Sequence, residues 1–404
     1  MKIRIVRTLD PGNWSRFVED HPQGNIFHTP EIFQVFERAA GHTPGLWAAV
    51  EADRDGEHNP GEERILALFL PVEITVSIGP GAGTILGGPL RRFTTRAVVY
   101  GSVIAAPGPE GEQALDRLME AYRQATDGRL LFTELRNLTP LDGLQPILDR
   151  RGFTYEGHLN YLVDLDRPPD EILQNISRRT RKQIRRALRK GDVVVEEVRD
   201  RQGLADCYEL LLQTYAAAEV PLADGSLFEA AFDLLVPRRM ARFTLARVEG
   251  RPAACSVELL YKDTAYGWYG GMDRDYGAYV PNEVLTWSIL EWAALRGYRV
   301  YDFGGAGKPD EEYGVRDFKA KFGGELVSYG RNTCVHAPVL LNASKVGYKL
   351  FRRLGLFGAA RPAGTSSSTQ AKPTWPGGLD EEPKTDGPLP SSGARRREQG
   401  VTGR

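Results

Sequence analysis

The most restrictive feature of this 404-residue sequence is that one order of helical and strand patterns occurs twice. In each half of the chain a helical periodicity, a strand hairpin, a second helix and a further strand follow one another. The second set begins roughly 170 residues after the first, which indicates a duplicated unit. These patterns cover 31–41, 46–53, 64–74, 112–126 and 130–138 in the first half, and 204–219, 242–250, 251–261, 282–297 and 298–305 in the second.

The connections within each unit set the class of fold. Hairpins require antiparallel strand pairing, whereas the helical crossover that closes each unit requires parallel pairing. The sequence therefore predicts an α/β protein of the α+β type with mixed, mostly antiparallel sheets. Because Pro168 and Pro169 end strand character between the units, we expect a first domain over 1–165 and a second over 166–340.

The C-terminal part of the chain has a different composition. Helical spacing over 341–357 separates apolar from basic residues, which predicts a terminal amphipathic helix. This helix either docks on the second domain or lies on a membrane surface. Residues 358–404 contain too few large apolar side chains to offset the entropy of ordering, so we expect a disordered tail.

Charge and cysteine content exclude several classes of protein. The 52 Lys and Arg residues nearly balance 53 Asp and Glu, so any contact with a polyanion must come from a local cluster. Three scattered cysteines and six isolated histidines supply neither a disulfide framework nor paired metal ligands. The sequence also lacks a signal-peptide pattern and a bilayer-spanning apolar run. We therefore expect a cytoplasmic protein with no metal or tightly bound cofactor.

One cluster of positive charge does occur, in the sequence SRRTRKQIRRALRKG over 177–191. Helical spacing places Ile184 and Leu188 on its apolar face and spreads the cations over the remaining surface. The stretch holds no acid at i±4 to reduce repulsion between these cations. It is either a solvated face or a site for a phosphate-rich ligand such as RNA, a diphosphate or lipid head groups. The cations expected to bind such a ligand are Arg178, Arg181, Lys182, Arg185 and Arg189.

The segment over 266–325 carries a family resemblance. An aromatic and glycine-rich strand is followed by Asn282 before a Trp-rich helix, then by DFGG at 302–305 and FKAKFGGE at 318–325. Together with the basic stretch upstream, this order resembles the FemABX aminoacyltransferases, which are grouped with the GNAT acyltransferases. The resemblance covers about 20–340. It implies two tandem GNAT-like domains and an enzyme that extends peptidoglycan stem peptides with amino acids from aminoacyl-tRNA.

The resemblance also implies roles for individual residues. Phe318 and Lys319 match a Phe-Lys pair beside the tetrahedral intermediate, where one preorganised cation stabilises an oxyanion by on the order of 3–4 kcal/mol. Alternatively, Lys319 is a surface lysine, with Lys321 as its nearest competitor. Asp302 either caps its strand or orients the acceptor amine, and Tyr269 either faces substrate or belongs to the core. The further residues expected to bind substrate are Arg274 and Asn282.

The expected partners are aminoacyl-tRNA as donor and a cell-wall precursor, soluble or lipid-linked, as acceptor. The family's basic residues for a nucleotide diphosphate have no match in 225–228 or in the helix over 31–37, which disfavours a soluble UDP-linked acceptor. A peripheral membrane contact would suit a lipid-linked acceptor. The sequence predicts no particular oligomeric state.

Two alternatives belong to other classes. The first is a GNAT N-acyltransferase of envelope or polysaccharide synthesis that uses acyl-CoA, whose diphosphate would bind at a helix N-terminus. The loop over 274–279 begins like such a site, but Tyr279 occupies a small-residue position and disfavours CoA. The second alternative is a non-catalytic, membrane-associated scaffold.

Overall fold

The computed structural model describes residues 2–52, 63–75, 94–141 and 143–344. The strands of the first half are β1 (Lys2–Val6), β2 (His42–Pro44), β3 (Trp47–Ala52), β4 (Ile65–Phe69), β5 (Val72–Thr75), β6 (Thr95–Tyr100), β7 (Val103–Ala105), β8 (Phe132–Arg136), β9 (Thr154–Glu156) and β10 (Leu159–Asp164). Its helices are α1 (Pro11–Asp20), η1 (Ile26–His28), α2 (Pro30–Arg38), α3 (Pro109–Thr126) and α4 (Gln145–Arg150).

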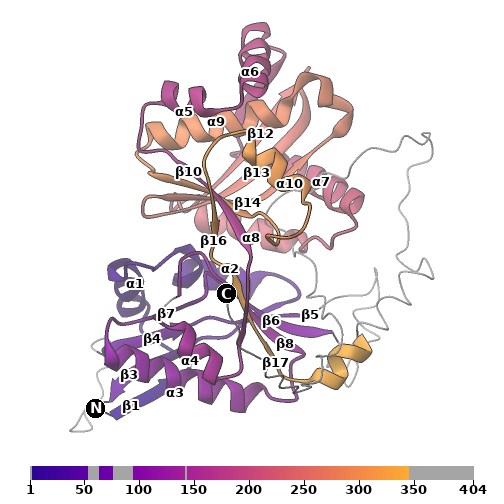
Figure 1. Ribbon diagram of the computed structural model, residues 1–404. Coiled ribbons are helices and arrows are strands. Elements are labelled where there is room, and N and C mark those ends of the chain that lie inside the picture. Colours follow the sequence, from indigo (N-terminus) through magenta and orange to yellow (C-terminus); the bar gives the residue numbers. More distant parts are fainter. Residues whose placement is uncertain (1, 53–62, 76–93, 142, 345–404) are drawn as a thin grey trace, which may run out of the picture.

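The second half follows a similar order (Figure 1). Its helices are α5 (Pro169–Asn175), α6 (Arg178–Lys190), α7 (Arg201–Ala218), α8 (Gly225–Leu235), η4 (Arg274–Tyr279), α9 (Pro281–Leu295) and α10 (Gly314–Ala320). Its strands are β11 (Val193–Glu197), β12 (Ala241–Val248), β13 (Arg251–Tyr261), β14 (Thr264–Met272), β15 (Val300–Gly305), β16 (Glu325–Ser328) and β17 (Arg331–Val335).

The described strands form three sheets, of which the four-stranded sheet is antiparallel throughout and the other two are mixed. Their strand orders are β1-β3-β4-β7, β2-β5-β6-β8-β17-β9 and β11-β12-β13-β14-β15-β10-β16. The predicted hairpins pair antiparallel, as in β12 with β13. The predicted crossovers pair parallel: Val98 of β6 lies opposite Glu134 of β8, and Tyr266 of β14 lies opposite Asp302 of β15. The mixed α/β class predicted from the sequence is confirmed.

Sheet membership does not follow the predicted division at 165 and 166. Strand β10 precedes this division but lies between β15 and β16 in the seven-stranded sheet. Strand β17 belongs to the second half of the chain but lies between β8 and β9 in the six-stranded sheet. Each unit therefore completes its sheet with a strand from the other half of the sequence.

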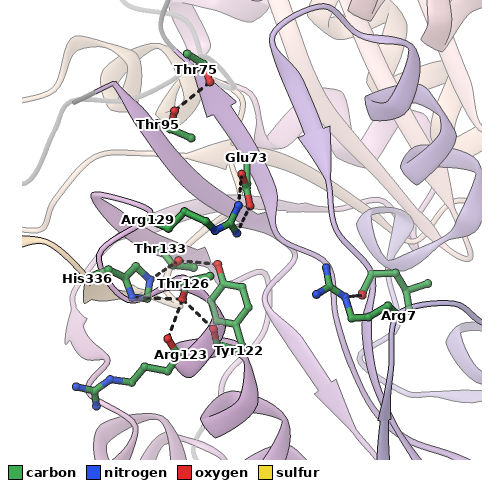
Figure 2. Close-up of polar contacts among 11 residues, drawn as sticks. Arg7, Glu73, Thr75, Thr95, Tyr122, Arg123, Thr126, Arg129, Thr133 and His336 are labelled. Carbon is green, nitrogen blue, oxygen red and sulfur yellow. Dashed lines mark hydrogen bonds and ion pairs between the residues drawn. The ribbon is translucent and has the colours of Figure 1, made fainter. Parts of the chain in front are cut away.

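A buried polar cluster holds the segment after β17 against the first unit, as Figure 2 shows. Nε2 of His336 lies 2.8 Å from Oγ1 of Thr133, and that hydroxyl is also 2.8 Å from the hydroxyl of Tyr122. Burial lowers the pKa of His336, so the ring favours its neutral form, which suits a hydrogen bond between neutral groups. The cluster ties the end of the second half to the core of the first.

Further contacts join the two units. Helix α9 covers one face of the seven-stranded sheet, while α7 and α8 cover the other face and α8 packs on α2 of the first unit. The backbone N–H of Ala40 donates to Oγ of Ser226 at 2.8 Å. In the β13–β14 turn, Nζ of Lys262 donates to the carbonyls of Val18 and His21 at 3.1 and 2.8 Å, at the C-terminal end of α1. Lys262 therefore places a positive charge at the C-terminal end of α1, where the helix dipole is negative.

The chain is helical again over 338–344, where the described residues end. This stretch includes the first residues of the terminal helix predicted over 341–357. The remainder of that helix and the tail predicted over 358–404 lie outside the described residues. Among the described helices, none has the length and apolar character needed to span a bilayer.

Candidate active site

The candidate site is built at the carboxyl end of β15, around Asp302. The Asp302 side chain is buried, and Oδ1 accepts a hydrogen bond from the backbone N–H of Gly304 at 2.6 Å. Nδ2 of Asn160, from the neighbouring strand β10, lies 3.4 Å from both carboxylate oxygens. Gly304 has a φ of +70°, and a Cβ there would lie 3.0 Å from the Tyr266 hydroxyl. The DFGG motif thus turns the backbone so that an N–H points at the carboxylate.

Lys319 extends from α10 to this same strand end. Its exposed fraction is 0%, and Nζ donates to the carbonyl oxygens of Gly304, at 3.1 Å, and Gly305. Lys319 is therefore buried, and the alternative prediction that it lies on the surface is wrong. Lys321, its competitor, is part-exposed and lies 3.4 Å from Oε1 of Glu283. Of the two lysines, only Lys319 reaches the end of β15.

The glycines of the FGGE motif bring α10 back against the sheet. Gly324 has a φ of +115°, and a Cβ there would lie 2.2 Å from the carbonyl oxygen of Leu162 in β10. A larger residue would therefore push the segment after α10 away from the sheet. The ring of Phe318 is half-buried and packs on Phe322 with centroids 5.2 Å apart. Nε of Arg316 donates to the carbonyl of Ala306 at 2.9 Å and holds the loop after β15.

The electrostatics of Asp302 follow from these contacts. Burial raises the pKa of its carboxyl to about 6, even though the Gly304 N–H, the Lys319 ammonium and Asn160 all lower it. Near neutral pH this carboxyl is mostly ionised but can still take up a proton. A buried acid whose pKa lies close to neutrality, next to a fixed ammonium, suits proton transfer coupled to the stabilisation of a negative charge.

A pocket between the two units reaches this site. The described residues that line this pocket enclose a volume of about 30 Å³. Asn160 and Gly305 line it from the side of the candidate site. Its other lining residues are Phe27, Tyr100, Gly101, Arg136, Asn137, Leu138, His158, Tyr266, Trp268, Gly330 and Arg331.

The structure does not bring the three predicted substrate-binding residues to this pocket. Tyr269 is buried in the core, where its ring centroid lies 4.8 Å from that of Phe228. Asn282 is buried in the first turn of α9, and Arg274 is exposed on η4. On β14 the residues that line the pocket are instead Tyr266 and Trp268.

Sequence reasoning missed several residues of the site and pocket. Asn160 is a buried polar residue between Leu159 and Tyr161 in strand β10, and this interruption was a usable signal. Arg136, His158 and Arg331 come from three separate segments, and only the exchange of β10 and β17 between the sheets places them together. No local sequence pattern predicts that these three residues line the same pocket.

The predicted basic helix is confirmed as α6, and its packing differs from the prediction at one residue. Ile184 is buried as predicted, but Leu188 is 47% exposed, so its predicted burial is wrong. The buried positions of the helix are Thr180, Ile184 and Ala187, which form a face too narrow to include Leu188.

The predicted polyanion-binding cations lie mostly on the open side of α6. Arg181 is half-buried and donates to the carbonyl of Gln174. The backbone N–H of Ser177, the N-cap of α6, donates to the carbonyl of Lys321 at 2.7 Å. The basic helix therefore begins where α10, which carries Lys319, ends. The exposed cations of the predicted set are Arg178, Lys182, Arg185 and Arg189.

The loop that would hold a CoA diphosphate forms the short helix η4 in front of α9. The Tyr279 hydroxyl lies 3.5 Å from Oε1 of Glu249, and the Tyr279 ring faces that of Tyr276 with centroids 6.5 Å apart. Among the described residues, no three His, Cys, Asp or Glu side chains are grouped to hold a metal ion.

Comparisons with known sequences point to acyl transfer. The profile of the acetyltransferase (GNAT) domain family matches residues 174–319, which include Asp302 and Lys319. The lipid II:glycine glycyltransferase of Staphylococcus epidermidis is 23% identical over 230 residues, covering 41% of this chain and 55% of that protein. The Staphylococcus aureus protein of the same name is 22% identical over 235 residues with the same coverage. The chain thus spans about half the length of these relatives.

Solved structures share the fold over a longer stretch. The crystal structure of FemX superposes with a TM-score of 0.60 at 17% identity and covers 87% of this chain and 99% of that chain. A tandem GNAT protein from the clavulanic acid biosynthesis pathway has a TM-score of 0.51 at 12% identity and covers 83% of this chain and 99% of its own. These similarities confirm the predicted tandem GNAT-like fold. The chain therefore carries a GNAT acyltransferase domain and is a distant homologue of the lipid II:glycine glycyltransferases of the FemABX family.

Proposed function

We propose that this protein transfers an aminoacyl group from aminoacyl-tRNA to an amine of a peptidoglycan or other cell-envelope precursor. The observation that carries the proposal is the buried Lys319, whose ammonium is fixed on two backbone carbonyls at the strand end that also holds Asp302. The resemblance to the FemABX enzymes supports the same assignment of Phe318 and Lys319.

The proposed reaction is the aminolysis of an ester. The acceptor amine attacks the ester carbonyl, and the carbonyl oxygen becomes an oxyanion. Collapse of this intermediate forms the amide and breaks the ester C–O bond, and the departing tRNA oxygen takes up the proton given up by the amine and leaves as a hydroxyl. Because Lys319 is already held in place in a site shielded from water, it stabilises the oxyanion without reorganising. Asp302, with a pKa of about 6, is suited to accept the proton that the amine loses.

The basic helix supports tRNA as the donor. Four of the five cations predicted to bind a polyanion are exposed on α6, and the helix starts next to the end of α10. A phosphate backbone lying along α6 would therefore approach the helix that carries Lys319. Binding that rests on such contacts depends steeply on salt, because each neutralised phosphate releases counterions.

The names of the relatives support a lipid-linked acceptor, since they are lipid II:glycine glycyltransferases. A second candidate donor is acyl-CoA, which is favoured by the match to an acetyltransferase (GNAT) domain family. In that case the diphosphate would lie at the N-terminal end of α9, where Tyr279 stands in the preceding loop.

The test is a transfer assay with purified protein and a lipid-linked stem-peptide precursor. Parallel reactions receive a pool of charged tRNAs or acetyl-CoA, and mass spectrometry measures the mass added to the precursor. We expect addition of an amino-acid residue with charged tRNA only. Addition of an acetyl group from acetyl-CoA would replace the proposal by the second candidate. Binding of the precursor without any transfer from either donor would favour the scaffold.

A further inference from the structure

Two buried asparagine side chains line the pocket between the units. Asn137 follows β8 and Asn160 lies in β10, and their exposed fractions are 3% and 5%. Nδ2 of Asn137 donates to the carbonyl of Tyr329 at 3.0 Å, and Nδ2 of Asn160 lies 3.4 Å from both carboxylate oxygens of Asp302. In each side chain the nitrogen is thus engaged by the protein, and the carbonyl oxygen is left to accept from a ligand.

These two side-chain oxygens have no donor in the described part of the chain. Oδ1 of Asn137 is buried and accepts no hydrogen bond from a described residue. The hydrogen bonds that the Asn160 side chain makes to described residues both involve Nδ2 and not Oδ1. A buried acceptor without a donor is unfavourable, because it has given up its hydrogen bonds to water. The pocket therefore suits a ligand that brings hydrogen-bond donors.

The orientation of Asn160 is set by Asp302. An ionised carboxylate only accepts hydrogen bonds, so the amide must turn its Nδ2 towards the carboxylate and its Oδ1 away. The carboxylate is itself held, because Oδ1 of Asp302 accepts from the Gly304 N–H at 2.6 Å. The register of β10 with β15 also shifts between Asn160 and Leu162, and such a bulge redirects the side chains beside it. Asn160 is therefore a preorganised acceptor.

The size and polarity of the pocket fit an amino group. A volume of about 30 Å³ admits a group the size of a water molecule, and an amino group is of similar size. His158 lines the same pocket, and its pKa is lowered to about 2, first by burial and then by Arg331 and Arg136. The same surroundings would keep an amine neutral. A neutral primary amine donates through two N–H groups and keeps a lone pair for attack.

We infer that this pocket binds the amino group of the acceptor through the side-chain oxygens of Asn137 and Asn160, so that the protein selects primary amines. The lone pair then remains available for the ester carbonyl. Gly305 lines the pocket and accepts a hydrogen bond from Lys319, which places the bound amine beside the cation proposed to stabilise the oxyanion. The inference rests on the proposed function, since it names the acceptor class for the same site.

The first experiment compares two acceptors that differ only in methylation. A lipid-linked stem-peptide precursor, and the same precursor with one N-methyl group on each free amine, are titrated into the full chain and followed by calorimetry. N-methylation leaves one N–H for two acceptor oxygens, so we expect it to weaken binding by about tenfold or more. Equal affinities for the two precursors would overturn the inference.

Variants of the two asparagines test whether their oxygens cause this preference. Asn160→Leu keeps the branching of the side chain but removes the acceptor, so the preference for the primary amine should fall to about threefold or less. Asn137→Leu should have the same effect. The matched control is Asn332→Leu, because Asn332 is also buried but does not line the pocket. An undiminished preference in both pocket variants would contradict the proposed contacts.

Asp302→Asn keeps the test decisive if a leucine variant fails to fold, because it removes a buried charge and preserves the shape of the side chain. The Gly304 N–H would hold Oδ1 of the new amide, so the new Nδ2 would face Asn160. Asn160 would then turn its own Nδ2 towards the pocket. We expect the preference for the primary amine to be lost from the binding affinities. A preference equal to that of the wild type would overturn the proposed orientation.

Binding and transfer together separate the inference from the proposed function. Preferential binding of the primary amine without transfer from any charged tRNA would overturn the proposed function and leave the amine pocket intact. Transfer to both precursors at equal rates would overturn the amine pocket and leave the transferase intact. Absence of both binding and transfer would overturn the two together.

Discussion

Glu134 and Asp302 occupy equivalent positions in the two units and behave in opposite ways. Each is the third residue of a strand that pairs parallel with its neighbour, opposite Val98 in one unit and Tyr266 in the other. Both carboxyls are buried. The pKa of Glu134 is lowered to about 2, whereas that of Asp302 is raised to about 6. Burial is therefore not sufficient to set the protonation of a buried acid.

The partners of the two acids account for the difference. Glu134 has guanidiniums directed at its oxygens, and their attraction exceeds the cost of burial. Lys319 lowers the pKa of Asp302 by its charge, but its ammonium donates to the carbonyls of Gly304 and Gly305. The first unit thus holds a fixed charge, while the second holds a carboxyl that can exchange a proton. Only the second arrangement suits acid–base chemistry.

The largest expected effect is on stability, and it has opposite signs at the two positions. Because its pKa is lowered in the folded state, Glu134 stabilises the fold above pH 4.5, and this contribution is lost as the pH falls towards 2. Glu134→Gln should therefore lower the free energy of unfolding by on the order of 3 kcal/mol at pH 7. Asp302 binds its proton more tightly in the folded state, so stability falls as the pH rises from about 4 to 6. Asp302→Asn should remove that loss and raise the free energy of unfolding by on the order of 3 kcal/mol at pH 7.

Urea denaturation of both variants and of the wild type between pH 4 and 8 measures these differences. The gain from Asp302→Asn should grow with pH up to about 7, while the loss from Glu134→Gln should be nearly constant above about pH 5. A change of the same sign in both variants at pH 7 would contradict the comparison.

The next effect concerns the cation of the second unit. Lys319→Met should lower kcat by about 100-fold with little change in KM, because the lost interaction is made chiefly in the transition state. Lys321→Met is the matched control, since this neighbouring lysine lies on the surface beside Glu283. Transfer kinetics with saturating donor provide the measurement. Loss of activity in the control alone would assign the role to Lys321.

A smaller effect is expected from proton exchange at Asp302. If its ionised form accepts a proton from the amine, the rate of the wild type should rise with pH through about 6 and then level off. Asp302→Asn should lower kcat by roughly tenfold or more at pH 8 and remove that rise. The pH profiles of both proteins between 5 and 8.5 make the test. Persistence of the rise in the variant would mean that another group titrates.

The smallest effect on stability is expected at the basic helix α6, which carries neither of the two buried acids. Replacing Lys182, Arg185 and Arg189 together by Gln should change the free energy of unfolding by only about 0.5 kcal/mol per site, because all three are exposed. The affinity for tRNA should fall, and the slope of log Kd against log salt should decrease by about one unit per lost contact. A much lower Tm with unchanged tRNA affinity would make α6 a structural element only.

Much of the fold could be predicted because its determinants are local. The hairpin of β12 and β13 and the amphipathic helix α6 follow from spacing within a few turns or strands. Packing of α6 was less predictable, since helical spacing placed Leu188 on the apolar face although the helix buries only a narrower stripe. Which part of an amphipathic face is covered depends on the partner, here chiefly α9.

The candidate site could be predicted in part. The resemblance identified Asp302, Phe318 and Lys319, and the structure brings Asp302 and Lys319 to the same strand end. The predicted substrate residue Tyr269 lies in the core, because the direction of a side chain along β14 depends on a β-bulge that pattern reading does not detect. Such an irregularity shifts the alternation of faces along the strand.

The sequence by itself determined the duplicated order of elements, the parallel crossovers, the basic helix and the glycines that turn the chain at DFGG and FGGE. The tertiary structure alone decided the exchange of β10 and β17 and the charged pocket that this exchange creates. It also decided the opposite pKa shifts of Glu134 and Asp302. The physical reason is range: periodicity and turns act between near neighbours in sequence, whereas burial and charge act between whichever residues the fold places within a few ångströms.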